Sequence, residues 1–200
     1  LTMGASTDPS EKLARTEGRA MPGVELIAIQ PDGKKAQAGE EGELRAKAPQ
    51  LMLGYLDSQL DDDAFDENGY FQTGDLGIID EDGYVVISGR LKDVIIRYGE
   101  NISAKEVEDL LFQHPSIMDV AVIGLPDEVT GERACAVLSI NKEAAPITIE
   151  EMQKYLDDAG LRRNAIPEQL EIIELIPRNP SGKITKNVLK EEFKNSAFLR

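Results

Sequence analysis

Three short segments of the sequence place together residue types that could bind a nucleotide or stabilise an anionic reaction. The first is the Thr-Gly-Asp triplet at residues 73–75, which precedes an apolar run. A carboxylate such as that of Asp75 can accept hydrogen bonds from both hydroxyl groups of a ribose. Taken alone, the triplet is more simply explained as a turn in front of a strand.

The second segment, residues 89–101, joins two cations to an apolar stretch and a glycine turn. The guanidinium of Arg90 offers a fork of donors that suits phosphate or ribose oxygens, and Lys92 adds a point charge close by. The apolar stretch ends at Tyr98 and Gly99, where the glycine indicates a turn. By themselves, both cations could equally be surface charges in water.

The third segment, residues 179–185, reads Asn-Pro-Ser-Gly-Lys-Ile-Thr. Pro180 and Gly182 place Lys183 on a constrained loop, where its ammonium could approach a carboxylate or a phosphate. The segment is not a P-loop, because the earlier glycine is missing and Ile184 follows the lysine in place of Ser or Thr. In isolation, such a segment is more often a turn than a catalytic loop.

The composition is typical of a soluble globular protein. The 200 residues are 41% hydrophobic and 30% charged, and a chain of this length typically buries roughly 70% of its unfolded surface. No apolar run approaches the roughly 20 residues that would span a bilayer. The first residues fit neither a signal peptide nor a start at an initiator methionine. We therefore expect this sequence to be a piece cut from within a longer chain.

The net charge of −15, without a cluster of Lys or Arg, argues against nucleic acid as a partner because such a surface repels phosphate. A nucleotide can still bind, since a pocket needs only local donors. The one cysteine, Cys135, lies in an apolar stretch, which predicts buried packing and not catalysis. The one histidine, His114, cannot build a metal site by itself, and the following Pro115 indicates the end of a helix.

Residues 1–91 are predicted to be mostly β. Runs of apolar residues bounded by turn residues mark the candidate strands 24–29, 42–46, 76–79 and 84–87. The tetrapeptide at residues 80–83 predicts a hairpin between the last two of them, with Gly83 supplying a positive φ.

Residues 92–200 are predicted to mix strands and helices. Capping boxes at Ser103 and Thr148 each predict the start of a helix, and Gly160 suits the C-terminal cap of the second. The other expected elements are strands at 120–123, 133–140 and 170–175 and a short helix at 184–193. This interleaving predicts a small α+β domain. The boundary at residues 90–92 lacks the Gly, Ser or Pro excess of a flexible linker, and a short hinge is the alternative.

In this order, the three segments resemble the adenylate-forming superfamily, which includes acyl-CoA synthetases, firefly luciferase and the adenylation domains of peptide synthetases. Further motifs of that family match in order at residues 18–24, 42–44, 54–55, 114–115, 124–127 and 131–132. The resemblance covers nearly the whole chain, and agreement by chance at all of these positions is improbable.

The resemblance implies an α+β fold class in two parts. Residues 1–91 would be the end of the β-barrel-like subdomain of a large domain, and residues 92–200 would be a small mobile cap. Asp75 would hold the ribose hydroxyls of ATP and AMP, and Arg90 would contact ribose or phosphate. Lys183 would bridge the substrate carboxylate and the α-phosphate during adenylation. Two reacting anions need a local cation there, which Mg²⁺ and a lysine can supply.

Members of this family run two half-reactions with two orientations of the cap. Lys92 is at the family's hinge position, and rotation there would remove Lys183 and bring the Gly99 loop to the site. Tyr98 and Gly99 would then line the tunnel for the pantetheine arm of CoA, because a glycine permits close approach by a thin substrate.

The function implied is that of an acyl-CoA synthetase, which activates a fatty or aryl acid with ATP and passes it to CoA. The need for ATP and CoA, without a disulfide framework, predicts the cytoplasm. The phosphate loop, the acyl pocket and the Mg²⁺ ligands would lie upstream, so we expect the 200 residues alone to be inactive. The alternatives are an adenylating enzyme with a non-CoA acceptor, a nucleotide- or partner-binding module without catalysis, and a structural domain. Intact Asp75, Arg90 and Lys183 count against the binding module, since a descendant without catalysis need not keep all three.

Overall fold

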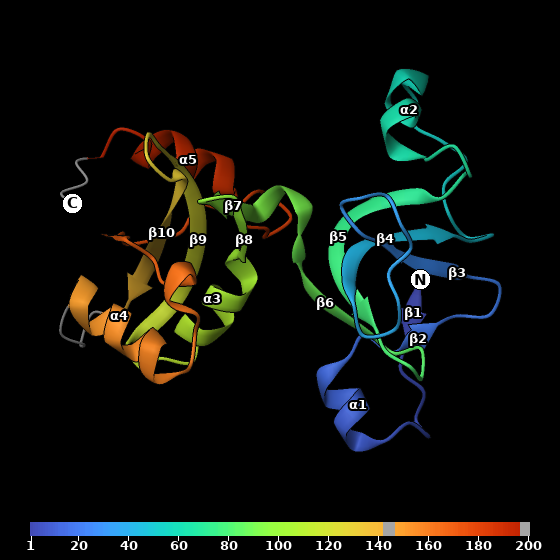
Figure 1. The fold of residues 1–200 in the computed structure, drawn as a ribbon, viewed down its shortest axis with the longest axis horizontal. Coiled ribbons are helices and arrows are strands. Elements are labelled where there is room, and N and C mark those ends of the chain that lie inside the picture. Colours follow the sequence, from blue (N-terminus) through green and yellow to red (C-terminus); the bar gives the residue numbers. More distant parts are fainter. Residues whose placement is uncertain (142–146, 197–200) are drawn as a thin grey trace. The chain divides into compact units, whose positions relative to one another are not determined.

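The strands expected in the first half of the chain form one antiparallel sheet (Figure 1). The computed structural model describes residues 1–141 and 147–196. The strands of this sheet, in spatial order, are β3 Glu25–Ile29, β4 Glu41–Lys47, β5 Phe71–Ile79 and β6 Val85–Arg90. A small core forms where Ala28, Leu44 and Val85 meet partly buried aliphatic side chains of the sheet and of the connection between β3 and β4.

The chain divides into two compact units, Leu1–Lys92 and Asp93–Arg200. The four-stranded sheet belongs to the first unit, and a five-stranded sheet belongs to the second. No helix among the described residues is long and apolar enough to cross a membrane.

The first unit also contains short elements that the sequence pattern did not predict. They are β1 Thr2–Met3, α1 Ser10–Arg15, β2 Arg19–Ala20, the 3-10 helix η1 Ser58–Leu60 and α2 Asp61–Ala64. Lys12 on α1 forms an ion pair with Asp80 in the hairpin loop between β5 and β6. The Lys12 ammonium and the Arg19 guanidinium lie 4.8 and 4.9 Å from the centroid of the Tyr84 ring. These contacts fix the N-terminal segment to the sheet.

The second unit interleaves strands and helices, as the sequence predicted. Its elements are the hairpin strands β7 Val94–Arg97 and β8 Glu100–Ser103, α3 Ala104–Leu111, β9 Ile117–Asp127, β10 Gly131–Ile140, α4 Ile149–Asp158, η3 Arg163–Ala165, β11 Gln169–Ile172 and α5 Lys186–Phe193. Strand β10 pairs antiparallel with β9 and β7 and parallel with β11.

The helix boundaries follow the predicted caps. The Ser103 hydroxyl accepts a hydrogen bond from the backbone N–H of Glu106 at the start of α3. At the start of α4, Thr148 and Glu151 complete a capping box in both directions. Gly160 follows α4 with a φ of +85°, a conformation that glycine adopts without steric cost.

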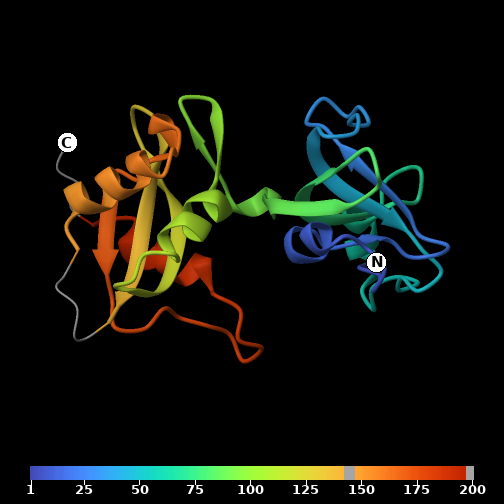
Figure 2. The same ribbon diagram turned by 90° about the horizontal axis from the view of Figure 1, so that it is seen from below.

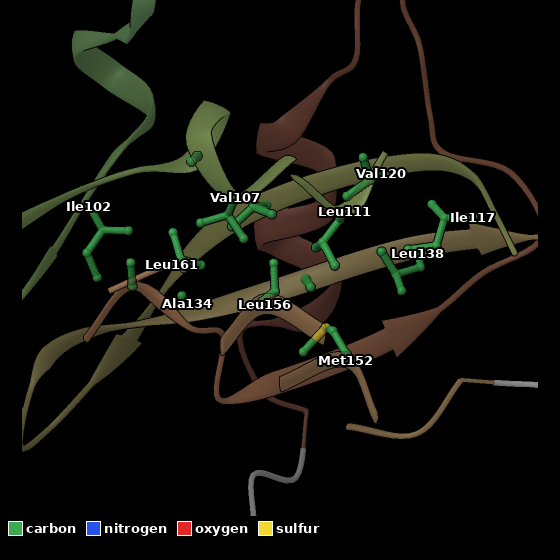
Figure 3. Close-up of a cluster of buried hydrophobic side chains, with 14 of the residues drawn as sticks. Ile102, Val107, Leu111, Ile117, Val120, Ala134, Leu138, Met152, Leu156 and Leu161 are labelled. Atoms are coloured by element: carbon green, nitrogen blue, oxygen red, sulfur yellow. The ribbon is translucent and has the colours of Figure 1, made fainter. Parts of the chain in front are cut away.

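The sheet of the second unit is covered on both faces, and the alternation of side chains along β9 and β10 explains why. Val120, Val122, Ala134, Ala136 and Leu138 enter one core, which includes residues of α3 and α4 such as Val107, Leu111, Met152 and Leu156 (Figure 3). Ala121, Ile123, Leu125, Cys135 and Val137 enter a second core with Ile176, Leu189 and Phe193. A strand buried on both faces lacks the apolar and polar alternation of a half-exposed strand.

Several predicted strands differ in length from those observed, among them β5, β6, β9 and β11. Strand β9 extends through Asp127, beyond the predicted end at residue 123, because it pairs with β10 up to the contact between Asp127 and Gly131. Strand β11 ends at Ile172 and not at residue 175, since its pairing with β10 stops at Leu138. The predicted final helix begins at Lys186, two residues later than expected.

Candidate functional site

The Thr-Gly-Asp triplet forms a bulge inside strand β5. The register between β4 and β5 passes from Glu43 opposite Leu76 to Arg45 opposite Gln72, so three residues face Leu44 alone. The triplet therefore does not precede the strand, as the sequence suggested, but interrupts it. Bulges bend a strand and redirect its side chains, and they are frequent next to functional sites.

Three features hold this bulge. Gly74 has a φ of +68°, in the left-handed region that glycine favours. The Thr73 hydroxyl donates a 2.6 Å hydrogen bond to the Leu44 carbonyl and accepts one of 3.1 Å from the Asp75 backbone N–H. The bulge is therefore fixed by its own backbone and by the neighbouring strand, which leaves the Asp75 carboxylate free of a structural task in the bulge.

Asp75 and Arg90 are register partners on β5 and β6. The Arg90 Nε donates to Asp75 Oδ1 over 3.1 Å, and the two side chains are 46% and 34% exposed. An ion pair this exposed contributes at most about 1 kcal/mol to stability. The pair presents a carboxylate and a guanidinium side by side at the surface of the first unit, a donor and acceptor set that suits ribose and phosphate oxygens.

Tyr98 and Gly99 are the two central residues of the turn between β7 and β8. Their φ angles are +51° and +77°, as a two-residue type I′ hairpin turn requires. A tyrosine in this conformation costs roughly 1–2 kcal/mol, and such strain is concentrated at functional sites. The Tyr98 side chain is 66% exposed, and a Cβ added to Gly99 would meet no atom within 4 Å. The turn is therefore open to a ligand.

The hairpin is anchored by residues that sequence reasoning had not assigned a role. Arg97 donates to the Asn164 carbonyl and to Glu168 Oε1, each over 2.7 Å. Glu132 Oε2 accepts a 2.7 Å hydrogen bond from the Ile96 backbone N–H. Glu132 lies in one of the motifs that carried the resemblance, so the sequence held a signal for it. Arg97 and Glu168 are far apart in sequence, and no local pattern indicates their contact.

Lys183 is exposed on a tight loop between β11 and α5. Asn179 Oδ1 accepts hydrogen bonds from the Ser181 N–H, the Ser181 hydroxyl and the Lys183 N–H, over 3.1, 2.8 and 2.9 Å. The Lys183 carbonyl in turn accepts from the Asn179 N–H over 2.9 Å, and Gly182 has a φ of +81°. The predicted constraint on this loop is therefore present, and Asn179 contributes as much to it as Pro180.

The same loop is fixed to the sheet through Arg178. Its guanidinium donates to Asp119 Oδ2 over 2.7 Å and to the Gly182 carbonyl over 2.8 Å. Within residues 1–141 and 147–196, no carboxylate forms an ion pair with Lys183. The backbone of the loop is held while the ammonium of Lys183 stays available. Figure 2 shows the orange-to-red connection between β11 and α5 that contains this loop.

Lys92 is exposed in the 3-10 helix η2 Leu91–Asp93 and is the last residue of the first unit. The other candidates separate between the units: Asp75 and Arg90 lie together in the first, whereas Tyr98, Gly99 and Lys183 lie on two different loops of the second.

The one cysteine and the one histidine are held in packing and hydrogen-bond contacts within the second unit. Cys135 is fully buried, as predicted, and desolvation raises the pKa of its thiol to about 12, which keeps the thiol neutral and unreactive. His114 follows α3, packs edge-on against Tyr155 at 4.9 Å, and accepts a hydrogen bond at Nδ1 from the Ser116 N–H. In the described part of the chain, no group of three or more His, Cys, Asp or Glu side chains could hold a metal ion.

Comparison with known proteins identifies relatives over about nine tenths of the chain. Residues 106–183 match the family of AMP-binding enzyme C-terminal domains. The chain is 39% identical over 186 residues to the medium-chain fatty-acid–CoA ligase of Escherichia coli K12, and 40% identical over 184 residues to the salicyl-AMP ligase / salicyl-S-ArCP synthetase of Mycobacterium tuberculosis. These matches cover 92% and 91% of this chain but 33% and 32% of the relatives. The chain thus spans about a third of the length of the curated relatives it matches.

A solved structure agrees with these relatives. ATP-bound MatB from Rhodopseudomonas palustris matches with a TM-score of 0.83 and 36% identity, over 90% of this chain and 36% of that chain. The chain has an α+β fold and is similar, over about nine tenths of its length, to about one third of the length of these relatives. Residues 106–183 match the AMP-binding enzyme C-terminal domain, and the relatives of the chain are adenylate-forming ligases, which confirms the resemblance.

Proposed function

We propose that the chain is the C-terminal part of an acyl-CoA synthetase that activates a fatty acid with ATP and transfers the acyl group to CoA in the cytoplasm. The observation that carries the proposal is the Lys183 loop. Its backbone is fixed by Asn179 and Arg178, while its ammonium is exposed and unpaired within the described residues. Because the loop that carries this cation is already fixed, it does not have to rearrange when negative charge develops beside it during the reaction.

In the first half-reaction, the substrate carboxylate attacks the α-phosphorus of ATP and pyrophosphate leaves. Two anions approach each other in this step, and we assign Lys183 to the charge that develops between them. Asp75 accepts hydrogen bonds from the ribose hydroxyls, and Arg90, which it pairs at 3.1 Å, contacts ribose or phosphate oxygens. The exposure of this pair supports the assignment because a ligand can reach both groups without unfolding the sheet.

Mg²⁺ would bind to the phosphates of ATP and neutralise part of their negative charge. Because the described residues offer no cluster of ligands for a metal ion, we assign no Mg²⁺ ligand within this chain and place those ligands in the upstream region.

In the second half-reaction, the CoA thiolate attacks the acyl carbonyl and AMP leaves. We assign Lys92 to the hinge about which the second unit rotates, and Tyr98 and Gly99 to the surface that the pantetheine arm passes. The open space around Gly99 and the strained φ of Tyr98 support this part of the proposal.

A different acceptor is the second candidate. The salicyl-AMP ligase / salicyl-S-ArCP synthetase is as similar to this chain as the fatty-acid–CoA ligase is, at 40% against 39% identity. An acceptor other than CoA would leave the assignments of Asp75, Arg90 and Lys183 unchanged, because these residues act in adenylation.

The test uses the full-length protein with ATP, Mg²⁺ and a panel of fatty and aromatic acids, with and without CoA. Formation of acyl-CoA by the wild type, with loss of acyl-AMP formation in Lys183→Ala, supports the proposal, and the panel identifies the acid. Acyl-AMP without a thioester would favour the second candidate. Neither product across the panel would contradict both, and a binding module without catalysis would then be the interpretation to pursue.

A further inference from the structure

Lys186 is the first residue of α5 and lies in a network of charges that none of the assignments above uses. Its Nζ is 2.9 Å from Glu108 Oε1 on α3 and 3.5 Å from Asp93 Oδ2 at the start of the second unit. The three side chains are only 15%, 20% and 22% exposed. Glu108 Oε1 also accepts a 2.8 Å hydrogen bond from the Val122 backbone N–H. The lysine therefore joins α5, α3, β9 and the first residue of the unit.

The position of this network in the chain is what makes it informative. Asp93 directly follows Lys92, and Lys186 comes three residues after Lys183. The network thus connects the residue after the proposed hinge to the end of the proposed catalytic loop. The other end of that loop is held separately, by the 2.7 Å contact of Arg178 with Asp119.

The segment between Lys183 and Lys186 leaves little freedom for movement. Both the backbone N–H and the hydroxyl of Thr185 donate to the Pro177 carbonyl, over 2.9 and 3.0 Å. Arg178 and Ile184 are bridged in antiparallel register. A displacement of α5 at Lys186 would therefore be transmitted to the Lys183 backbone.

We propose that Lys186 is a positioning residue, which makes the segment after Lys92 and the Lys183 loop one rigid body. This inference rests on the proposed function, because Lys92 as hinge and Lys183 as catalytic residue are themselves assignments. In this arrangement, rotation about Lys92 moves Asp93. Because the half-buried ion pairs hold Lys186 to Asp93, the Lys183 loop moves together with Asp93. Removal of Lys186 also leaves Asp93 and Glu108 as neighbouring half-buried carboxylates without their shared cation, so the two segments are expected to separate.

The first test is hydrogen exchange of the full-length protein, which needs no substrate. Lys186→Met is compared with Lys194→Met, a matched control that removes the exposed pair between Lys194, the residue after α5, and Glu191 on that helix. We expect faster exchange in residues 93–95 and 178–186 together in Lys186→Met alone. Exchange that matches the control in both segments, or a change in only one of them, would overturn the inference. Asp93→Asn, which removes one carboxylate partner and keeps the lysine, is the milder second variant and should loosen the same two segments.

The second test separates positioning from simple stabilisation. In Lys186→Met, kcat for acyl-AMP formation should fall by about tenfold to a hundredfold, the scale of a misplaced catalytic group, while KM for ATP stays within about twofold of the wild type. Lys186→Arg, which keeps the charge, should restore most of kcat. Equal kcat in Lys186→Met and Lys194→Met, or no rescue by arginine, would reject the role. If the wild type forms no acyl-adenylate, the proposed function fails, and the exchange result still decides whether Lys186 couples the two segments.

Discussion

Arg90 donates a hydrogen bond to Asp75 across adjacent strands, although the two residues belong to separate sequence motifs. The bulge at residues 73–75 and the pairing of β5 with β6 bring them side by side. Because the pair is exposed, it contributes little to folding, and its residue types are explained better by a ligand than by stability.

Asp75→Asn should therefore weaken nucleotide use and leave the fold intact. Loss of a charged acceptor for two ribose hydroxyls should lower kcat/KM for ATP by roughly tenfold to a hundredfold, and the midpoint of thermal unfolding should stay close to that of the wild type. Steady-state kinetics of the full-length protein would measure this. Asp82→Asn, on the exposed hairpin of the same sheet, is the control and should change neither quantity; a wild-type kcat/KM in Asp75→Asn would refute the assignment.

Lys183→Ala should abolish most of the adenylation activity without loss of stability. Removing one preorganised charge at the reacting centre typically costs 10²–10³ in kcat, and the exposed side chain makes no ion pair within the described residues. Single-turnover measurement of acyl-AMP would show the loss. Asn179→Ala provides a comparison: it keeps the ammonium but removes the acceptor of three hydrogen bonds in the loop, so we expect an intermediate loss.

Lys92→Pro should impair thioester formation more than adenylation. Proline fixes φ near −65° and also restricts the preceding residue, so it limits rotation at this point of the backbone. Acyl-AMP formation and the conversion of supplied acyl-adenylate to thioester would be measured separately. Lys92→Ala, which keeps the backbone free, is the matched control; an equal loss of both half-reactions in the proline variant would contradict a hinge at this residue.

The hydrogen bonds of the buried Asp8 carboxylate lead us to expect that the free energy of unfolding depends on pH. The Ala5 backbone N–H, which donates over 2.7 Å, and the neighbouring Arg19 hold the pKa of this carboxyl below its ordinary value of 3.8. A lowered folded-state pKa means that the stabilisation is present above pH 3.8 and is lost as the pH falls through the folded value. Urea unfolding of wild type and Asp8→Asn should differ at pH 7 and converge toward pH 2. A difference that does not change with pH would contradict this origin.

The 200 residues by themselves should form no acyl-adenylate. They span about a third of the relatives' length, and we expect the family's phosphate loop and acyl pocket to lie outside them. A sensitive assay of pyrophosphate release with the purified chain, against the full-length protein at the same concentration, would test this. Measurable acyl-AMP from the chain would show that the adenylation machinery lies within these residues.

The sequence predicted many elements because their signals are local. The cap at Ser103 and the capping box at Thr148 satisfy backbone groups only three residues away, and Gly160 adopts the positive φ that its own position requires. The hairpin at residues 80–83 is likewise set by its turn residues. The short helix α1 was missed because it is held by contacts such as that of Lys12 with Asp80, which lies far along the chain.

By itself, the sequence determined the family, the α+β class, the burial of Cys135 and the loop that carries Lys183. Only the tertiary structure decided that residues 73–75 form a bulge, that Asp75 pairs with Arg90, and that Lys186 joins Asp93 to Glu108. Periodicity, caps and turns act over a few residues and can be recognised one segment at a time. Strand register and half-buried charge networks join residues many positions apart, and their geometry exists only after the sheets have formed and the helices have packed against them.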